Sequence, residues 1–82
     1  MEGKNQRPVT AIVLGASGRG KLYGDYSLEH PDDLQIIGIA ELVELRRNMY
    51  GDKYNVPKEN RVATWEELLD KPKFADAVII AT

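Results

Sequence analysis

The sequence contains no cysteine and only one histidine and one tryptophan among 82 residues. The absence of cysteine excludes disulfide bonds, thiolate nucleophiles and thiolate metal sites, and we expect no metal. Eleven basic and thirteen acidic side chains give a net charge of -2. No global field therefore favours nucleic acid or an anionic membrane, and we expect neither as a partner.

Long apolar runs are also missing. No stretch approaches the roughly 20 residues of a membrane span, and the first residues, MEGKNQRP, hold no hydrophobic segment that could serve as a signal peptide. We therefore expect a cytoplasmic protein. A chain of this length is one domain or part of one. We expect 1–7 to be a flexible lead-in and 8–82 to be a single partial domain.

Apolar runs of strand length alternate with amphipathic stretches of helix length. The pattern predicts long strands over 8–14, 34–40 and 76–82, a short edge strand over 61–63, and helices over 18–29, 43–53 and 65–69. Strands that alternate with helices at this spacing form a parallel sheet through right-handed crossovers. We therefore predict a partial α/β fold, a Rossmann-type doubly wound parallel sheet of about four strands in the order 3-2-1-4.

The helices have predicted inward faces. In the first helix, Leu22, Tyr23 and Tyr26 are expected to face the sheet. In the second helix, Leu45 and Met49 form one apolar stripe, which we also expect to face inward.

Smaller signals concern packing. Gly24 weakens the first helix by roughly 1 kcal/mol relative to alanine but would allow a close approach to the sheet. Thr64 and Glu67 have the spacing of a capping box at the start of the last helix. Trp65 and Phe74 are expected to cover the core or an edge of the sheet.

The glycine-rich turn after the first strand carries the clearest functional signal. The stretch 9–20 reads VTAIVLGASGRG, an apolar strand followed by a turn and a helix. Such a turn lets backbone N–H groups approach a phosphate at a helix N-terminus. Gly15 and Gly20 fit the first and third glycines of the dinucleotide pattern G-x-G-x-x-G, whereas Ser17 takes the middle place and Gly18 follows it. The alternative is a tight connection that holds no ligand.

An acidic residue follows the second strand at the distance that this pattern requires. Glu41 lies about 20 residues beyond the turn. Its carboxylate could accept hydrogen bonds from both hydroxyls of an adenosine ribose. Because Glu41 would repel a 2′-phosphate, NAD is favoured over NADP. The alternative is a solvated carboxylate near a positive helix end.

Basic residues lie near both features. Arg19, at the start of the first helix, could reach a phosphate. Arg46, one helical turn past Glu41, could stack on adenine or meet a 2′-phosphate. The alternative for both is a solvated surface cation. The ligand crevice of such sheets lies outside the carboxyl ends of the strands, where we expect Gly15 and Thr82 to face each other.

The stretch 8–82 resembles the N-terminal half-domain of the Gfo/Idh/MocA oxidoreductases, the glucose-fructose oxidoreductase and inositol dehydrogenase family. The resemblance is carried by GASGRGKLYGDY after the first strand, IIGIAELVELRR around the end of the second, and ATWEELLDKPKFADAVIIAT at the close. Ser17 and Leu42 depart from the glycine and the proline that are usual there. The resemblance implies an NAD(P)-dependent enzyme that oxidises or reduces sugars, polyols or related compounds.

The resemblance also implies where the cofactor binds. It puts the catalytic residues and the substrate-binding domain of the family after Thr82, so we expect no catalytic residue in this stretch and cofactor binding at most. The expected contacts with NAD, or less favourably NADP, are Gly15, Ala16, Ser17, Gly18, Arg19, Gly20, Glu41, Arg46, Ala81 and Thr82.

Two other functions fit the same sequence. The run Gly18, Arg19, Gly20 with a later acid also suits S-adenosylmethionine, as in a methyltransferase-like domain. A partial sheet would expose apolar surface, which would suit a non-catalytic Rossmann fragment that forms a homo-oligomer. A comparison of the affinities for NAD and for S-adenosylmethionine tests the first alternative. The oligomeric state measured by light scattering tests the second.

Overall fold

The structure is a computed structural model that describes residues 7–70 and 75–81. Most of the predicted lead-in at 1–7 lies outside the described residues, as do Phe74 and Thr82. The elements follow in the order β1 (Val9–Leu14), α1 (Gly18–Glu29), β2 (Leu34–Ala40), α2 (Glu44–Lys53), the short 3-10 helix η1 (Lys58–Asn60), β3 (Arg61–Val62), α3 (Trp65–Leu69) and β4 (Ala77–Ile80).

The four strands run parallel in one sheet, in the order β3-β2-β1-β4. Helices lie between successive strands. These observations confirm the predicted partial α/β fold of Rossmann type and the strand order 3-2-1-4. β3 has only two residues, as expected of a short edge strand.

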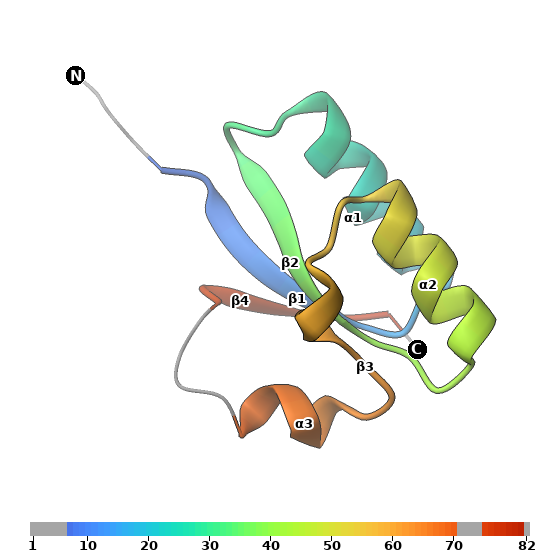
Figure 1. The fold of residues 1–82 in the computed structure, drawn as a ribbon. Coiled ribbons are helices and arrows are strands. Elements are labelled where there is room, and N and C mark those ends of the chain that lie inside the picture. The colour runs from blue at the N-terminus through green and yellow to red at the C-terminus, as the bar shows by residue number, and fades with distance from the viewer. Residues whose placement is uncertain (1–6, 71–74, 82) are drawn as a thin grey trace.

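Helices cover both faces of the sheet (Figure 1). α1 and α2 lie on one side, where the core includes Val13 from β1, Ile39 from β2 and Tyr50 from α2. α3 lies on the other side, where Leu68 packs with Ile12. Successive side chains of a strand point to opposite faces, so β1 and β2 are apolar along most of their length because both faces are covered.

The central strand β1 pairs with β2 on one side and with β4 on the other. Leu14 is level with Ala40 of β2 and with Ile80 of β4. The register shifts once, where Ile12 pairs with Gly38, and a Cβ on Gly38 would lie 2.8 Å from the Ile12 Cγ2 atom. Because the strands end level, the residues that follow them leave the sheet at one edge, where ligands of such folds bind.

The buried residues of α1 are small ones, namely Gly20, Gly24 and Ser27. The prediction that Leu22, Tyr23 and Tyr26 face the sheet is wrong, because all three are exposed. The physical reason is a close approach between helices. A Cβ on Gly24 would lie 2.6 Å from the ring of Tyr54, which follows α2. The tyrosine ring fills the space that a larger side chain of α1 would need.

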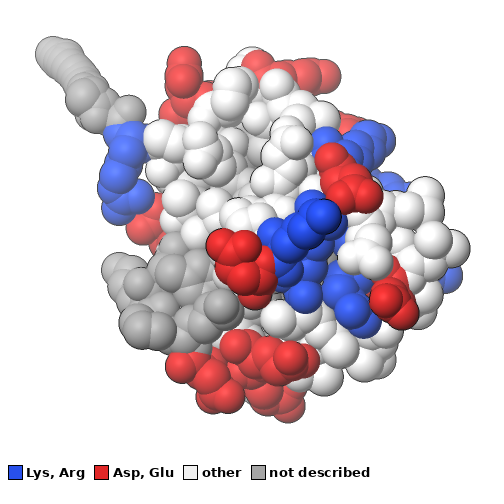
Figure 2. Space-filling view, in the orientation of Figure 1, with Lys and Arg blue, Asp and Glu red and all other residues white. Residues whose placement is uncertain are grey.

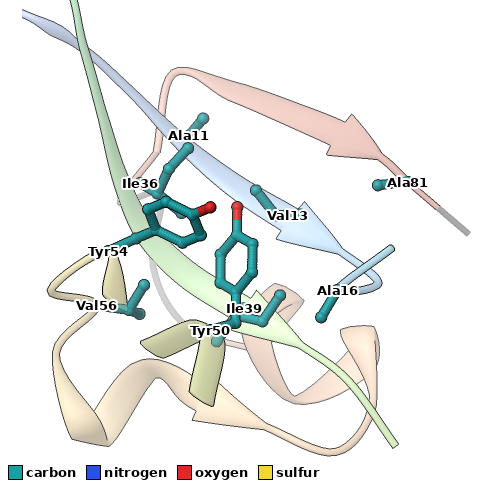
Figure 3. Close-up of a cluster of buried hydrophobic side chains, with 9 residues drawn as sticks. All are labelled: Ala11, Val13, Ala16, Ile36, Ile39, Tyr50, Tyr54, Val56 and Ala81. Atoms are coloured by element: carbon teal, nitrogen blue, oxygen red, sulfur yellow. The ribbon is translucent and has the colours of Figure 1, made fainter. Parts of the chain in front are cut away.

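The inward face of α2 also differs from the prediction. Leu45 and Met49 are exposed, and the buried positions belong to Tyr50 and, just after the helix, Tyr54. Figure 3 shows the two tyrosine rings side by side over the sheet, with their ring centroids 4.5 Å apart. The Tyr50 hydroxyl donates to the carbonyl oxygen of Gly20 at 2.6 Å, which ties α2 to α1.

The short helix α3 begins with the predicted capping box. The Glu67 carboxylate accepts a hydrogen bond from the backbone N–H of Thr64 at 3.1 Å. Trp65 is 49% exposed, so it is not part of the buried core, which is one of the two places predicted for it. Figure 2 shows acidic side chains gathered over α3, and basic and acidic side chains interspersed elsewhere on the displayed face. No helix within the described residues is long and apolar enough to cross a membrane.

Candidate functional site

The glycine-rich turn connects β1 to α1 at the edge where the strands end. Gly15 has a φ of 103°, a conformation that residues with a side chain rarely adopt. Its N–H donates to the carbonyl oxygen of Ala40 at 2.8 Å, which fixes the turn to the end of β2. A Cβ on Gly20 would lie 2.7 Å from the Gly15 carbonyl oxygen. The turn itself therefore requires both glycines, with or without a ligand.

Gly18 differs from these two glycines. A Cβ on Gly18 would meet nothing within 4 Å. Gly18 begins α1, whose first backbone N–H groups have no partner inside the helix. The first turn of α1 holds no acidic side chain, and Arg19 is exposed there. The start of α1 thus combines open space, N–H donors and a positive helix end, which together suit a phosphate.

Ser17 links the turn to the end of β4. It occupies the N-cap position of α1, but its side chain does not cap the helix. Instead, its hydroxyl donates to the carbonyl oxygen of Ala81. The N–H of Ala81 donates to the carbonyl oxygen of Leu14 at 2.9 Å. Ser17 and Ala81 therefore lie together at this edge, whereas Thr82, which we expected to face Gly15, lies outside the described residues.

Glu41 follows β2, and its carboxylate reaches the glycine-rich turn. Oε1 accepts a hydrogen bond from the N–H of Ala16 at 2.8 Å, and Oε2 accepts one from the N–H of Val43 at 3.0 Å. The Nε of Arg47 donates to the Glu41 carbonyl oxygen at 2.9 Å. The acid is therefore held between the turn and the start of α2. Arg47 therefore positions the Glu41 backbone.

The surroundings of Glu41 favour its ionised form. Partial burial by itself would raise the pKa of this carboxyl group. Hydrogen bonds from the N–H groups of Val43 and Ala16, and then the positive charges of Arg46 and Arg47, outweigh burial, and the pKa of Glu41 lies below its ordinary value. At neutral pH the carboxylate therefore only accepts hydrogen bonds.

A cavity of about 330 Å³ includes Glu41 in its wall, and we call it the Glu41 cavity. The other lining residues are mostly apolar: Leu14, Gly15, Ala40, Leu42, Ala63, Thr64, Trp65 and Glu66. Sequence reasoning missed Leu42 and Trp65 as site residues. The signal that could have found them is their position, because each large apolar side chain comes shortly after a strand end.

Arg46 lies elsewhere. It does not line the Glu41 cavity but a second cavity, which also includes Lys21 of α1 and Tyr50 of α2. Its charge still contributes to the low pKa of Glu41. The structure therefore brings the glycine-rich turn, Glu41 and Ala81 to one edge of the sheet, and it separates Arg46 from the Glu41 cavity.

Fold and site together define a class, an α/β unit of Rossmann type with a glycine-rich turn and an acid at the carboxyl edge of its sheet. No family model, curated protein or solved structure matches the chain. In the described residues, no group of acidic and histidine side chains could hold a metal ion.

Proposed function

We propose that this chain binds NAD at the carboxyl edge of its sheet, as the cofactor-binding portion of an NAD(P)-dependent oxidoreductase that acts on sugars, polyols or related compounds. The observation that carries the proposal is the position of the Glu41 carboxylate. It lies 2.8 Å from the N–H of Ala16 in the glycine-rich turn and also lines an apolar cavity. An acid between a phosphate-binding turn and an apolar cavity suits the ribose of an adenosine.

The residues at this edge fit the parts of a dinucleotide. Leu42 and Trp65 offer apolar and aromatic surface for an adenine ring. Glu41 would accept hydrogen bonds from the ribose hydroxyls, since each carboxylate oxygen has acceptor capacity beyond the one backbone N–H that it already binds. The open space at Gly18 and the N–H groups at the start of α1 would hold the diphosphate.

The proposal for this stretch is cofactor binding and not turnover. Among the described residues, no histidine or lysine lines the Glu41 cavity that could move a proton or position a substrate. The chemistry that NAD supplies when bound is hydride transfer. Without cysteine the chain forms no disulfide and needs no oxidising compartment, which is compatible with the cytoplasm as its proposed location.

The test is a titration followed by the fluorescence of Trp65, which is the single tryptophan and lines the cavity. NAD+ and ADP-ribose are expected to give saturable quenching, and NADP+ a weaker response. Glu41→Gln should weaken NAD+ binding about tenfold, because the amide replaces an ionised acceptor. The matched control is Glu44→Gln, which changes a neighbouring exposed acid outside the cavity and should leave NAD+ binding unchanged.

Three results would count against this function. The first is no saturable binding of NAD+ at millimolar ligand by protein that circular dichroism shows to be folded. The second is equal loss of binding in Glu41→Gln and Glu44→Gln. The third is a clear preference for S-adenosylmethionine in the same titration, which would favour the methyltransferase-like alternative.

A second candidate function is that of a non-catalytic module that associates with itself. The observation that favours it is the sheet edge at β4, where Val78 is 52% and Ile80 is 65% exposed. A short apolar edge strand is a surface that another strand can extend. This candidate and NAD binding are compatible, because the two surfaces differ.

A further inference from the structure

A second cavity, of about 410 Å³, lies between α1 and α2, and we call it the α1–α2 groove. Basic side chains come to it from both helices, and no acidic residue lines it. The lining residues are Ala16, Ser17, Lys21, Arg46, Met49, Tyr50, Lys53 and Tyr54. The glycine-rich turn separates this groove from the Glu41 cavity, since Gly15 lines the one and Ala16 and Ser17 line the other.

The helical repeat explains why the basic residues gather here. Four lining residues share one face of α2, because Met49, Tyr50 and Lys53 follow Arg46 by three, four and seven residues. Lys21 comes from the second turn of α1. Positive charge therefore borders the groove from both sides.

The buried residues that line the groove carry no charge. Tyr50 and Tyr54 are buried, and their hydroxyls donate to the Gly20 carbonyl oxygen at 2.6 Å and to the Asp25 carboxylate at 2.7 Å. Burial, followed by the bond to Asp25, raises the pKa of Tyr54 to about 12. The phenol adds no negative charge at neutral pH, so the floor does not offset the basic rim.

The basic residues are only partly neutralised by the protein. The Nζ of Lys53 lies 3.7 Å from the Asp25 carboxylate, in an exposed pair. Among the described residues, neither Lys21 nor Arg46 has a carboxylate within ion-pair distance. Two cations therefore border the cavity without an ion-pair partner among the described residues.

We propose that the α1–α2 groove is a second binding site, which takes a small phosphoryl anion such as inorganic pyrophosphate, and that this anion binds independently of a dinucleotide in the Glu41 cavity. Its recognition is electrostatic, through the Arg46 guanidinium and the Lys21 ammonium, with Lys53 at the far end of the groove. Two molecules can supply a diphosphate to the groove, namely a free pyrophosphate anion and the dinucleotide itself.

The test is calorimetric titration of the folded protein with inorganic pyrophosphate at low salt. Saturable binding is expected, and Arg46→Gln and Lys21→Gln should each weaken it about threefold to tenfold, because each removes one charge-assisted contact. The matched control is Lys58→Gln, which removes an exposed cation of η1 that lines neither cavity. Absence of saturable binding, or an equal effect of Lys58→Gln, would overturn the proposal.

A second arm of the titration identifies the source of the anion. With NAD+ present at saturation, and separately in Glu41→Gln, the affinity for pyrophosphate is expected to change less than about twofold. Competitive displacement by NAD+ would mean that the groove holds the diphosphate of the dinucleotide, and the separate site would be wrong. If NAD+ does not bind but pyrophosphate does, the proposed function fails while the anion site stands.

Discussion

The three glycines of the turn differ in whether the backbone requires a glycine at their position. Gly15 has a positive φ, and Gly20 has no room for a Cβ beside the Gly15 carbonyl oxygen. Gly18 meets neither condition, because its φ is not positive and the space around it is open. A side chain at Gly18 would therefore obstruct a ligand without disturbing the protein, whereas one at Gly20 would disturb the protein itself.

This difference gives a prediction at the scale of one residue. Gly20→Ala should lower the free energy of unfolding by about 1–3 kcal/mol, because a Cβ 2.7 Å from a carbonyl oxygen forces the backbone to shift. Gly18→Ala should change it by less than about 1 kcal/mol, and in the stabilising direction. Urea unfolding of both variants measures this contrast. Equal losses of stability would show that the turn is not packed as described.

Glu41 and Arg46 mark how far the site could be predicted from sequence. The turn and Glu41 follow from a local motif with a fixed spacing, and the structure brings them within hydrogen-bond distance of each other. Arg46 and Arg47 are adjacent in sequence, so no spacing rule separates them. The direction in which α2 leaves the sheet decides that Arg47 binds the Glu41 carbonyl oxygen while Arg46 lines the α1–α2 groove.

At the scale of elements, the strands and the helix bounds were predictable because apolar runs and turn residues are local signals. The inward helix faces were not predictable. A pattern rule directs the large apolar side chains Leu22 and Met49 inward, but α1 instead packs through small residues against the ring of Tyr54. A pattern rule counts apolar side chains, and glycine has none. The packing role of Gly24 depends on the ring of Tyr54, which follows 30 residues later in the chain.

The pairing of β4 with β1 is reinforced by one carboxylate. Asp76 accepts hydrogen bonds from the Arg7 guanidinium at 3.0 Å and 3.2 Å and from the N–H of Thr10 at 3.1 Å. The bond from Arg7, followed by that from Thr10, holds the pKa of Asp76 well below its ordinary value. These contacts fasten the start of the edge strand to the central strand.

The contacts of Asp76 make the stability of the protein depend on pH. A carboxyl group with a lowered pKa in the folded state stabilises the protein above its unfolded pKa, near 4, and this stability is lost as the pH falls through the lower folded value. The free energy of unfolding of the wild-type protein should therefore fall in acid. That of Asp76→Asn should be lower at neutral pH and should change less as the pH falls. Denaturant midpoints across a pH series measure both. Asp32→Asn, in an exposed turn, is the control and should follow the wild type.

At the scale of the whole molecule, the sheet is covered unevenly. α1 and α2 cover one face, but on the other face α3 has only five residues, and Val78 and Ile80 of β4 remain exposed. These two residues pair with Ile12 and Leu14, so they extend the apolar face of β1 toward the open edge. A surface of this kind favours association with another protein surface.

The prediction at this scale concerns self-association. The average mass from sedimentation should rise between micromolar and sub-millimolar protein, and Ile80→Lys should abolish the rise by placing a charge on the edge strand. Leu22→Lys is the matched control, since Leu22 is as exposed as Ile80 but lies on α1. A monomer at all concentrations, or an equal effect of both variants, would contradict self-association through β4.

The central position of β1 has a consequence for the synthesis of the chain. β1 is made first among the strands, yet its partner β4 follows 66 residues later, as the separation of Thr10 and Asp76 shows. At about 5–20 residues per second, a ribosome needs on the order of several seconds to supply that partner. During this interval one edge of an apolar strand is unpaired, and an unpaired strand edge is prone to aggregation until β4 has emerged.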